Sequence, residues 1–305
     1  MDPTYSTAQQ VKLGGLPYPK LQLKDIYALY GSRFGCWFGI TAPTSLLASV
    51  VLLMADRRIH TIYRSIPRGE IPYHLAQIAE AGVVRYGSFF AAWFLGCFAL
   101  AAIATVINGL DNYDDAEVWT SDRYRRARER FGPLLRAAFL TFLAFLTGMA
   151  IVVFVYLSLL RSLGRGNFLR FSYGASFIGM LIVASIVSCL GMAIPRVLSS
   201  NVGAWAALKS SIKLSKGYEQ LLSLLVLEST VGSLVAWYAT RFGLALLVPP
   251  HIRFTAEYGW FVDLVAVFAS AAVQPPMFIG FSLLASDRNA NLQTLPDFPE
   301  QAQAH

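Results

Sequence analysis

Six long runs of apolar residues constrain this chain more than any other feature of its sequence. A helix needs about 20 apolar residues to cross the roughly 30 Å of hydrocarbon in a bilayer, and each run is long enough to do so. A helix also satisfies its own backbone polar groups, which the bilayer interior requires. The sequence therefore predicts an all-α integral membrane protein with six transmembrane helices, at residues 34–55, 87–107, 134–160, 171–194, 221–248 and 260–285.

The composition supports this class. Hydrophobic residues make up 55% of the chain, charged residues make up 14%, and the mean hydropathy is +0.50, which is far from the balance of a soluble domain. The formal net charge of +7 does not indicate nucleic acid, because the basic residues cluster at the ends of the apolar runs, where lipid headgroups would meet them. We expect membrane lipids as partners and no nucleic acid.

The sequence offers no pattern that would hold a metal or a cofactor. Cys36, Cys97 and Cys189 lie inside apolar runs without CxxC spacing, which fits small buried packing residues. The histidines are scattered, and no nucleotide-binding loop or nucleophile elbow is found. We therefore expect no metal and no cofactor, and an intramembrane lipid-modifying enzyme that uses Glu228 and a second acid is left as a further alternative. An enzyme would have to use intramembrane carboxylates alone.

The rest of the chain leaves room for one domain. We expect an integral membrane domain at residues 19–289, flexible polar tails at residues 1–18 and 290–305, and no cleavable signal peptide. An even number of spans puts both termini on one side of the membrane, and all six lysines fall on that side. The positive-inside rule then predicts a multi-pass protein of the cell membrane with cytoplasmic N- and C-termini.

Each odd-numbered span follows the same kind of segment, so the chain reads as three repeats. Three charged or amphipathic helical segments each close on a glycine, at Gly35, Gly132 and Gly217. The predicted unit is an interfacial elbow helix, a span, an outer loop and a returning span. In the first outer loop, residues 72–85 have the spacing of a short amphipathic helix.

The second elbow carries the densest charge in the chain. Its arginines cannot enter the bilayer, where each charge would cost a few kcal/mol, but the helix can lie along the headgroups with Val118, Trp119 and Tyr124 toward the acyl chains. Gly132 and Pro133 would supply the bend into the next span. The alternative is a solvated loop helix. The candidate headgroup-binding residues are Arg123, Arg125, Arg126, Arg128, Arg130 and Arg136, with Lys209, Lys213 and Lys216 in the third elbow.

A second candidate site centres on Glu228, which lies within the fifth predicted span, about 10 Å from its start. A carboxylate at that depth normally faces the bundle interior or a water-filled cavity. One hypothesis is a polar cavity lined by Glu228, Ser229 and Gln274. The alternative is a structural polar contact, for which Arg136 is a candidate partner.

The sixth predicted span is interrupted near its middle by Gln274, Pro275 and Pro276. Proline removes a backbone donor and frees carbonyl groups. Broken helices of this kind occur at transporter sites, and a packing kink is the alternative. Arg241 and Asp263 lie near the outer ends of the last two spans, where we expect them to snorkel toward headgroups.

The third elbow lies in a tract with a recurring motif. A proline-ended span is followed by a helix of the form A-L-x-x-S-x-x-L-x-x-G and by a new span, with the motif at Ala207, Leu208, Ser211, Leu214 and Gly217. This tract resembles the membrane domain of bacterial glycerophosphoryl diester phosphodiesterases and of related stand-alone integral membrane proteins. Residues 23–35 and the ending at Asp287 and Arg288 are also similar. The resemblance implies the membrane domain alone, because this sequence has no counterpart of the family's catalytic barrel.

These observations favour a non-enzymatic integral membrane protein. Its basic elbow helices would interact with anionic lipids, and its bundle would organise the membrane or support a partner. The alternative is a transporter or lipid-translocating protein with a polar cavity around Glu228. Small residues along the spans would also allow a homodimer, and the sequence leaves the protein partner open.

Overall fold

Six helices in the part of the chain that the structure describes are long and apolar enough to cross a membrane, as the sequence predicts. The structure is a computed structural model, and it describes residues 22–66, 74–109, 120–163, 179, 181–199, 202–249 and 256–294. Every secondary-structure element within these ranges is a helix. The all-α multi-pass membrane class is therefore confirmed.

The first repeat consists of α1 (Leu23–Ser32), α2 (Phe34–Ser65) and α3 (Leu75–Gly109). The backbone N–H of Gln22 donates a hydrogen bond to the Asp25 carboxylate at 3.0 Å, which caps the first turn of α1. α2 and α3 pack as an antiparallel hairpin. The prediction of a separate short helix at residues 72–85 is wrong. α3 runs unbroken from Leu75 to Gly109, and it contains no proline that would end a first helix before the span.

The second repeat consists of α4 (Thr120–Glu129), α5 (Phe131–Leu163) and a returning span at Leu181–Leu198. The last part of this span is the short helix α7 (Ala193–Ser199). Glycine allows close packing between the two spans, since a Cβ at Gly148 would meet the side chain of Ile186. The second repeat is therefore also an elbow followed by a hairpin.

The third repeat consists of α8 (Ala204–Ser215), α9 (Glu219–Leu247), α11 (Ala256–Val273) and α12 (Pro275–Thr294). The returning span is broken between α11 and α12 at Gln274, where the sequence predicts an interruption. α12 extends to Thr294, so the expected C-terminal tail begins later than residue 290. The expected N-terminal tail at residues 1–18 and the end of the chain from residue 295 lie outside the described residues.

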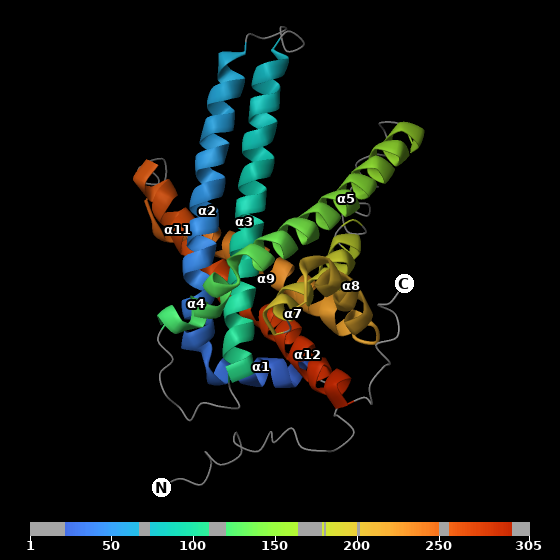
Figure 1. Ribbon diagram of the computed structural model, residues 1–305. Helices are drawn as coiled ribbons and strands as arrows, with labels where there is room; N and C mark the ends of the chain where they lie inside the picture. The colour runs from blue at the N-terminus through green and yellow to red at the C-terminus, as the bar shows by residue number, and fades with distance from the viewer. Residues whose placement is uncertain are drawn as a thin grey trace.

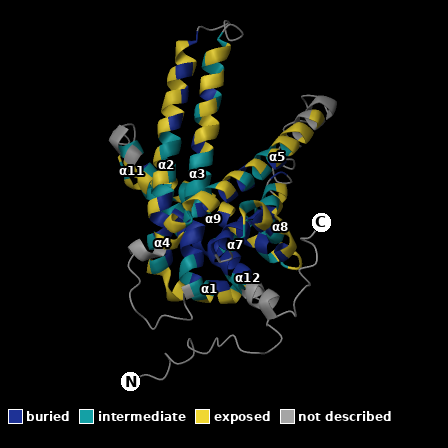
Figure 2. Ribbon diagram, viewed as in Figure 1, coloured by how far each residue is buried: buried dark blue, intermediate teal, exposed yellow. Residues whose placement is uncertain are grey.

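The three hairpins diverge from a common base. In Figure 1 the α2–α3 hairpin points upward, α5 leans to one side and α11 lies toward the other, while α1, α4, α8 and α12 lie in the lower half. Buried residues concentrate in that lower half, and exposed residues cover the upper parts of the hairpins (Figure 2). The main hydrophobic core joins all three repeats there, through residues that include Trp37, Ile103, Leu134, Leu225 and Phe281.

The bends between elbows and spans differ from the prediction. Gly217 has the left-handed backbone conformation that favours glycine, with φ at 87°. The first bend is instead at Arg33, and the second follows Glu129, so that Gly35 and Gly132 already belong to α2 and α5. A Cβ at either glycine would meet nothing within 4 Å. Glycine is therefore required at the third bend alone of these three.

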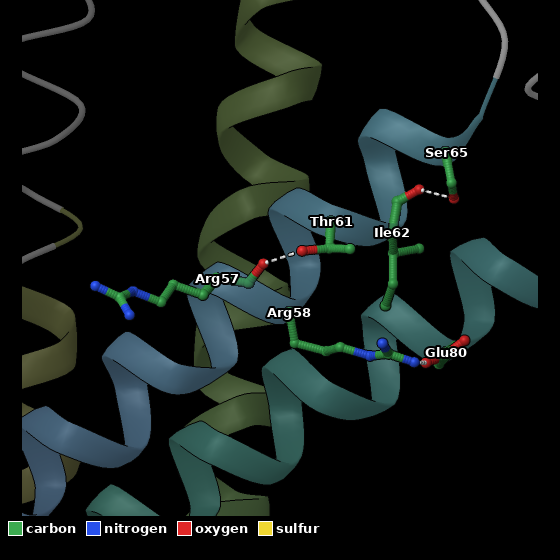
Figure 3. Close-up of polar contacts among 6 residues, drawn as sticks. All are labelled: Arg57, Arg58, Thr61, Ile62, Ser65 and Glu80. Carbon is green, nitrogen blue, oxygen red and sulfur yellow. Dashed lines mark hydrogen bonds and ion pairs between the residues drawn. The ribbon is translucent and has the colours of Figure 1, made fainter.

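The α2–α3 hairpin is longer than a bilayer is thick. α2 has 32 residues, or about 48 Å of helix, against roughly 30 Å of hydrocarbon. Its far end packs through a small separate cluster of Ile59, Ile62 and Ala81. There Arg58 Nη2 lies 2.7 Å from Glu80 Oε1 and joins the two helices (Figure 3). This end of the hairpin carries charges on both helices and projects beyond the apolar region.

Hydroxyl groups of the three elbow helices link the repeats in a ring. The Tyr30 hydroxyl of the first repeat donates to the carbonyl of Ala272 in the third. The Tyr124 hydroxyl of the second repeat donates to the carbonyl of Ile40 in the first, at 2.7 Å. The Ser211 hydroxyl of the third repeat donates to the carbonyl of Cys189 in the second, at 2.6 Å. Each elbow therefore holds a span of the preceding repeat, and the cycle closes.

We predict that Tyr124→Phe lowers the free energy of unfolding by about 1 kcal/mol, because it removes one hydrogen bond to a span carbonyl and keeps the aromatic ring. Tyr63→Phe at the far end of the first hairpin is the matched control, since Tyr63 is exposed. Equilibrium unfolding in mixed micelles, followed by circular dichroism, measures both. Equal unfolding free energies of the two variants would show that the hydrogen bond from Tyr124 does not help to hold the repeats together.

Candidate functional site at the elbow helices

The exposed surface at α8 combines three lysines with two large apolar side chains. Trp205, Lys209, Ile212 and Lys213 follow one another at helical spacing on α8, and Lys216 directly follows the last residue of the helix; all five are exposed. Trp205 is 59% exposed and Ile212 46%. Lys209 Nζ lies 5.7 Å from the centre of the Trp205 ring. Cations beside an aromatic ring and an aliphatic side chain are typical of a helix that lies in the headgroup region of a membrane.

The opposite face of α8 fixes the orientation of this surface. Ala207, Leu208, Ser211 and Leu214 are buried there, and α8 packs against α5 and α7. If α8 turned about its axis, it would lose the hydrogen bond from Ser211 to the Cys189 carbonyl, so this bond fixes the rotation of the helix. These buried residues are the ones that carry the motif noted in the sequence. The motif therefore positions the helix, and the residues between its members form the exposed face.

α4 has a different surface. Tyr124, expected at the acyl boundary, instead points into the protein: its ring stacks on Phe98, with centroids 5.3 Å apart, beside its hydrogen bond to Ile40. Ala127 is fully buried on the same face. The exposed face carries charged side chains, at Arg125, Arg126, Arg128 and Glu129. None of these four exposed positions carries an apolar side chain that could insert among lipids. The exposed face of α8 carries two, Trp205 and Ile212.

The other predicted headgroup residues of the second repeat have separate surroundings. Arg130 Nη1 donates to the carbonyl of Val197 at 3.2 Å and so caps the C-terminal end of α7. Arg125 Nε lies 3.6 Å from the Glu129 carboxylate. Arg136 is exposed, one turn inside α5. The side chain of Arg123, with Val118 and Trp119, lies outside what the structure describes.

Glu228 lies close to the first elbow helix. The pKa of the Tyr27 phenol on α1 is raised by burial first and then by the neighbouring Glu228 carboxylate. Tyr27 therefore keeps its proton, and Glu228 itself is exposed on α9. No ion pair joins Glu228 to Arg136, both of which the structure describes. Because Tyr27 belongs to an elbow, Glu228 lies beside the base of the bundle.

The proline break is stabilised by hydroxyl groups from the first repeat. Pro275 and Pro276 lack the N–H groups that would serve the carbonyls four residues earlier. The Ala271 carbonyl accepts a hydrogen bond from Thr41 at 3.1 Å, and the Ala272 carbonyl accepts one from Tyr30. Both freed carbonyls thus have donors. This arrangement supports the structural alternative for the break.

Gln274 takes part in the same polar cluster. Its Oε1 accepts a hydrogen bond from Ser45 at 3.3 Å. Ser229 is buried on α9. Among the described contacts, none joins Glu228, Ser229 and Gln274 to one another. The proposed polar cavity thus stays a prediction, and the contacts that are seen hold helices together.

The arrangement at α8 provides an exposed basic surface. The residues that the structure describes contain no group of three or more metal-ligating side chains. Comparison with protein-family models, with curated proteins and with solved structures found no match to this chain. The resemblance to the phosphodiesterase membrane domain therefore stays a prediction.

Sequence reasoning missed the residues that hold the repeats together. Tyr30, Thr41 and Ser211 are hydroxyl residues whose partners lie in another repeat, and their own positions give little sign of it. One signal was present: the two carbonyls freed by the consecutive prolines require donors in an apolar environment. That requirement predicts hydroxyl side chains nearby, although it does not identify them.

We predict that Pro276→Ala reduces the cost of Tyr30→Phe. With Pro276 present, Tyr30→Phe removes the side-chain donor from the Ala272 carbonyl and should cost about 1–2 kcal/mol of unfolding free energy. An alanine at 276 supplies an N–H for that carbonyl, so the same substitution should then cost less. A double-mutant cycle on unfolding free energies measures the coupling. Pro275→Ala is the control, because its new N–H would donate to the Ala271 carbonyl instead. It should leave unchanged the loss of unfolding free energy that Tyr30→Phe causes.

Proposed function

We propose that this protein is a non-enzymatic membrane-organising protein that gathers anionic lipids at the elbow end of its bundle. The observation that carries the proposal is the exposed face of α8, defined by Trp205, Lys209, Ile212, Lys213 and Lys216. The opposite face of the same helix is bound to the second repeat. A surface that is both fixed in orientation and open to lipid supports a role at the headgroups.

The magnitudes favour a measurable preference for anionic lipid. A lysine near an anionic membrane surface contributes about 1 kcal/mol, so three lysines on one face correspond to roughly a hundredfold preference at low salt. Trp205 and Ile212 keep the helix at the depth where these charges meet phosphates. The preference should weaken as salt screens the charges.

The same face supports a cytoplasmic location for the elbows and for both termini. The anionic surface potential of a cell membrane is greatest on its cytoplasmic leaflet, and all three lysines of α8 lie at the elbow end. α4 would add its exposed arginines to the same side. Its contribution should be smaller per charge, because Arg125 lies beside Glu129 and no exposed apolar side chain at positions 125 to 128 anchors the helix.

We predict that replacing Lys209, Lys213 and Lys216 together by glutamine removes most of the enrichment of anionic lipid around the protein. Spin-labelled phosphatidylglycerol in nanodiscs of phosphatidylcholine measures this enrichment, as the motionally restricted fraction of the label. The expected result is a fall by at least tenfold in relative affinity at low salt and a smaller fall at high salt.

Two charge-matched variants give the controls for this experiment. Glutamine at Arg57, Arg64 and Arg85 removes the same charge from the far end of the first hairpin and should leave the enrichment unchanged. Glutamine at Arg125, Arg126 and Arg128 tests α4 and should give an intermediate loss. If the α8 variant keeps the wild-type affinity at low salt, the proposed function is wrong.

A further inference from the structure

The far end of the third hairpin carries an ion pair that faces outward. Arg241 on α9 and Asp263 on α11 lie with Nη2 and Oδ1 3.4 Å apart. The sequence predicts that each residue snorkels separately, and the structure instead places them together. Their side chains are 44% and 42% exposed. Both side chains are therefore partly accessible from outside the protein, although the Asp263 Oδ1 that faces Arg241 is itself buried and accepts no hydrogen bond from the residues that the structure describes.

The position of this pair corresponds to the leaflet opposite the elbows. α9 begins at Glu219 next to its elbow, so Arg241 lies about 33 Å further along the helix axis, close to the full hydrocarbon thickness. Asp263 lies in the first half of α11, which runs in the other direction. Exposed apolar side chains flank the pair at Phe242, Phe261 and Leu264. The pair thus lies near a headgroup layer, with hydrocarbon-facing residues around it.

Aromatic side chains surround the arginine. The guanidinium of Arg241 lies 4.4 Å from the centre of the Trp237 ring. Tyr238 meets the same ring edge-on, with centroids 5.4 Å apart, and is itself exposed. Tryptophan and tyrosine concentrate at the headgroup level of membranes. The two aromatic side chains therefore indicate, independently of the helix length, that Arg241 lies at the depth of the headgroups.

The geometry of the pair leaves hydrogen-bonding capacity for a ligand. A closed charge-assisted contact has a separation of about 2.7–2.9 Å, as in the pair of Arg58 and Glu80 at 2.7 Å. The separation of Arg241 and Asp263 is longer. Nor is the pair needed to join the two helices, because Ser233 and Ser270 already exchange hydrogen bonds between α9 and α11, at 3.4 and 3.1 Å.

We propose that Arg241, Asp263 and Trp237 form a binding site for a zwitterionic phospholipid headgroup with a primary ammonium, that of phosphatidylethanolamine. The Arg241 guanidinium binds the phosphate, and the Asp263 carboxylate accepts hydrogen bonds from the ammonium. The two charges of the site complement the two charges of that headgroup. An anionic headgroup would meet Asp263 as a like charge, and a choline headgroup has no N–H to donate.

This site is separate from the α8 face in place and in chemistry. The α8 face carries lysines and suits anionic lipid, whereas the Arg241–Asp263 site carries one charge of each sign. The two sites lie at opposite ends of α9. Each proposal can therefore fail without the other.

The test uses native mass spectrometry of the full chain with phosphatidylethanolamine, its N-methyl and N,N-dimethyl forms, and phosphatidylcholine, all with the same acyl chains. The expected result for the wild type is a stepwise loss of affinity with each methyl group, to about tenfold overall. Asp263→Asn should abolish this dependence, and Arg241→Gln should weaken all four lipids.

The control and the contrary outcomes are equally specific. The triple glutamine variant of the α8 lysines should keep the dependence on methylation and lose affinity for phosphatidylglycerol alone. If the wild type binds the four lipids equally, or if Asp263→Asn keeps the dependence, the site does not exist and the ion pair is a structural contact. The methylation series on the wild type decides the matter even if the variants do not fold.

Discussion

The structure depends on the requirement that every backbone carbonyl in an apolar environment has a donor. Two consecutive prolines break this condition at the start of α12, and the first repeat restores it through Thr41 and Tyr30. The other two elbow helices make the same type of contact without a proline break to explain it, through Tyr124 and Ser211. Each contact joins an elbow to the preceding repeat, so the three repeats close into a ring at one end of the bundle.

This ring accounts for the uneven distribution of packing. The main hydrophobic core lies at the base, where elbows and spans of all three repeats meet, and the hairpins separate above it. Away from the base each hairpin is held mainly by its own two helices, as by Ile59, Ile62 and Ala81 between α2 and α3. The separated faces are apolar, as helices that contact lipid should be. Charged side chains are few on the far part of the third hairpin, where Arg241 and Asp263 lie, whereas the far end of the first hairpin carries charges on both helices.

The sequence predicts the features that depend on local composition. The six spans, the three elbow helices and the break at Gln274 follow from hydropathy, periodicity and proline. What it does not predict is the rotation of each elbow about its own axis, because that rotation is decided by partners far away in the chain. Tyr124 illustrates this: its position suits an acyl boundary, yet a carbonyl of the first repeat draws it inward. The same uncertainty separates α4 from α8: the sequence marks both as basic elbow helices, and their exposed faces differ.

The two faces of α8 would connect the proposed lipid binding to the integrity of the ring. Ser211 donates to the carbonyl of Cys189 on one face, and the lysines proposed to bind headgroups lie on the other. A ligand that binds only the folded arrangement must stabilise it, by an amount that grows with ligand concentration relative to its dissociation constant. Lipid on the α8 face would therefore stabilise the contact between the second and third repeats. Because the ring is closed, the contact between the second and third repeats would also help to keep the first repeat in place, where its hydroxyl groups donate to the carbonyls at the proline break. Lipid composition on the elbow side would then act on the whole bundle through one short helix.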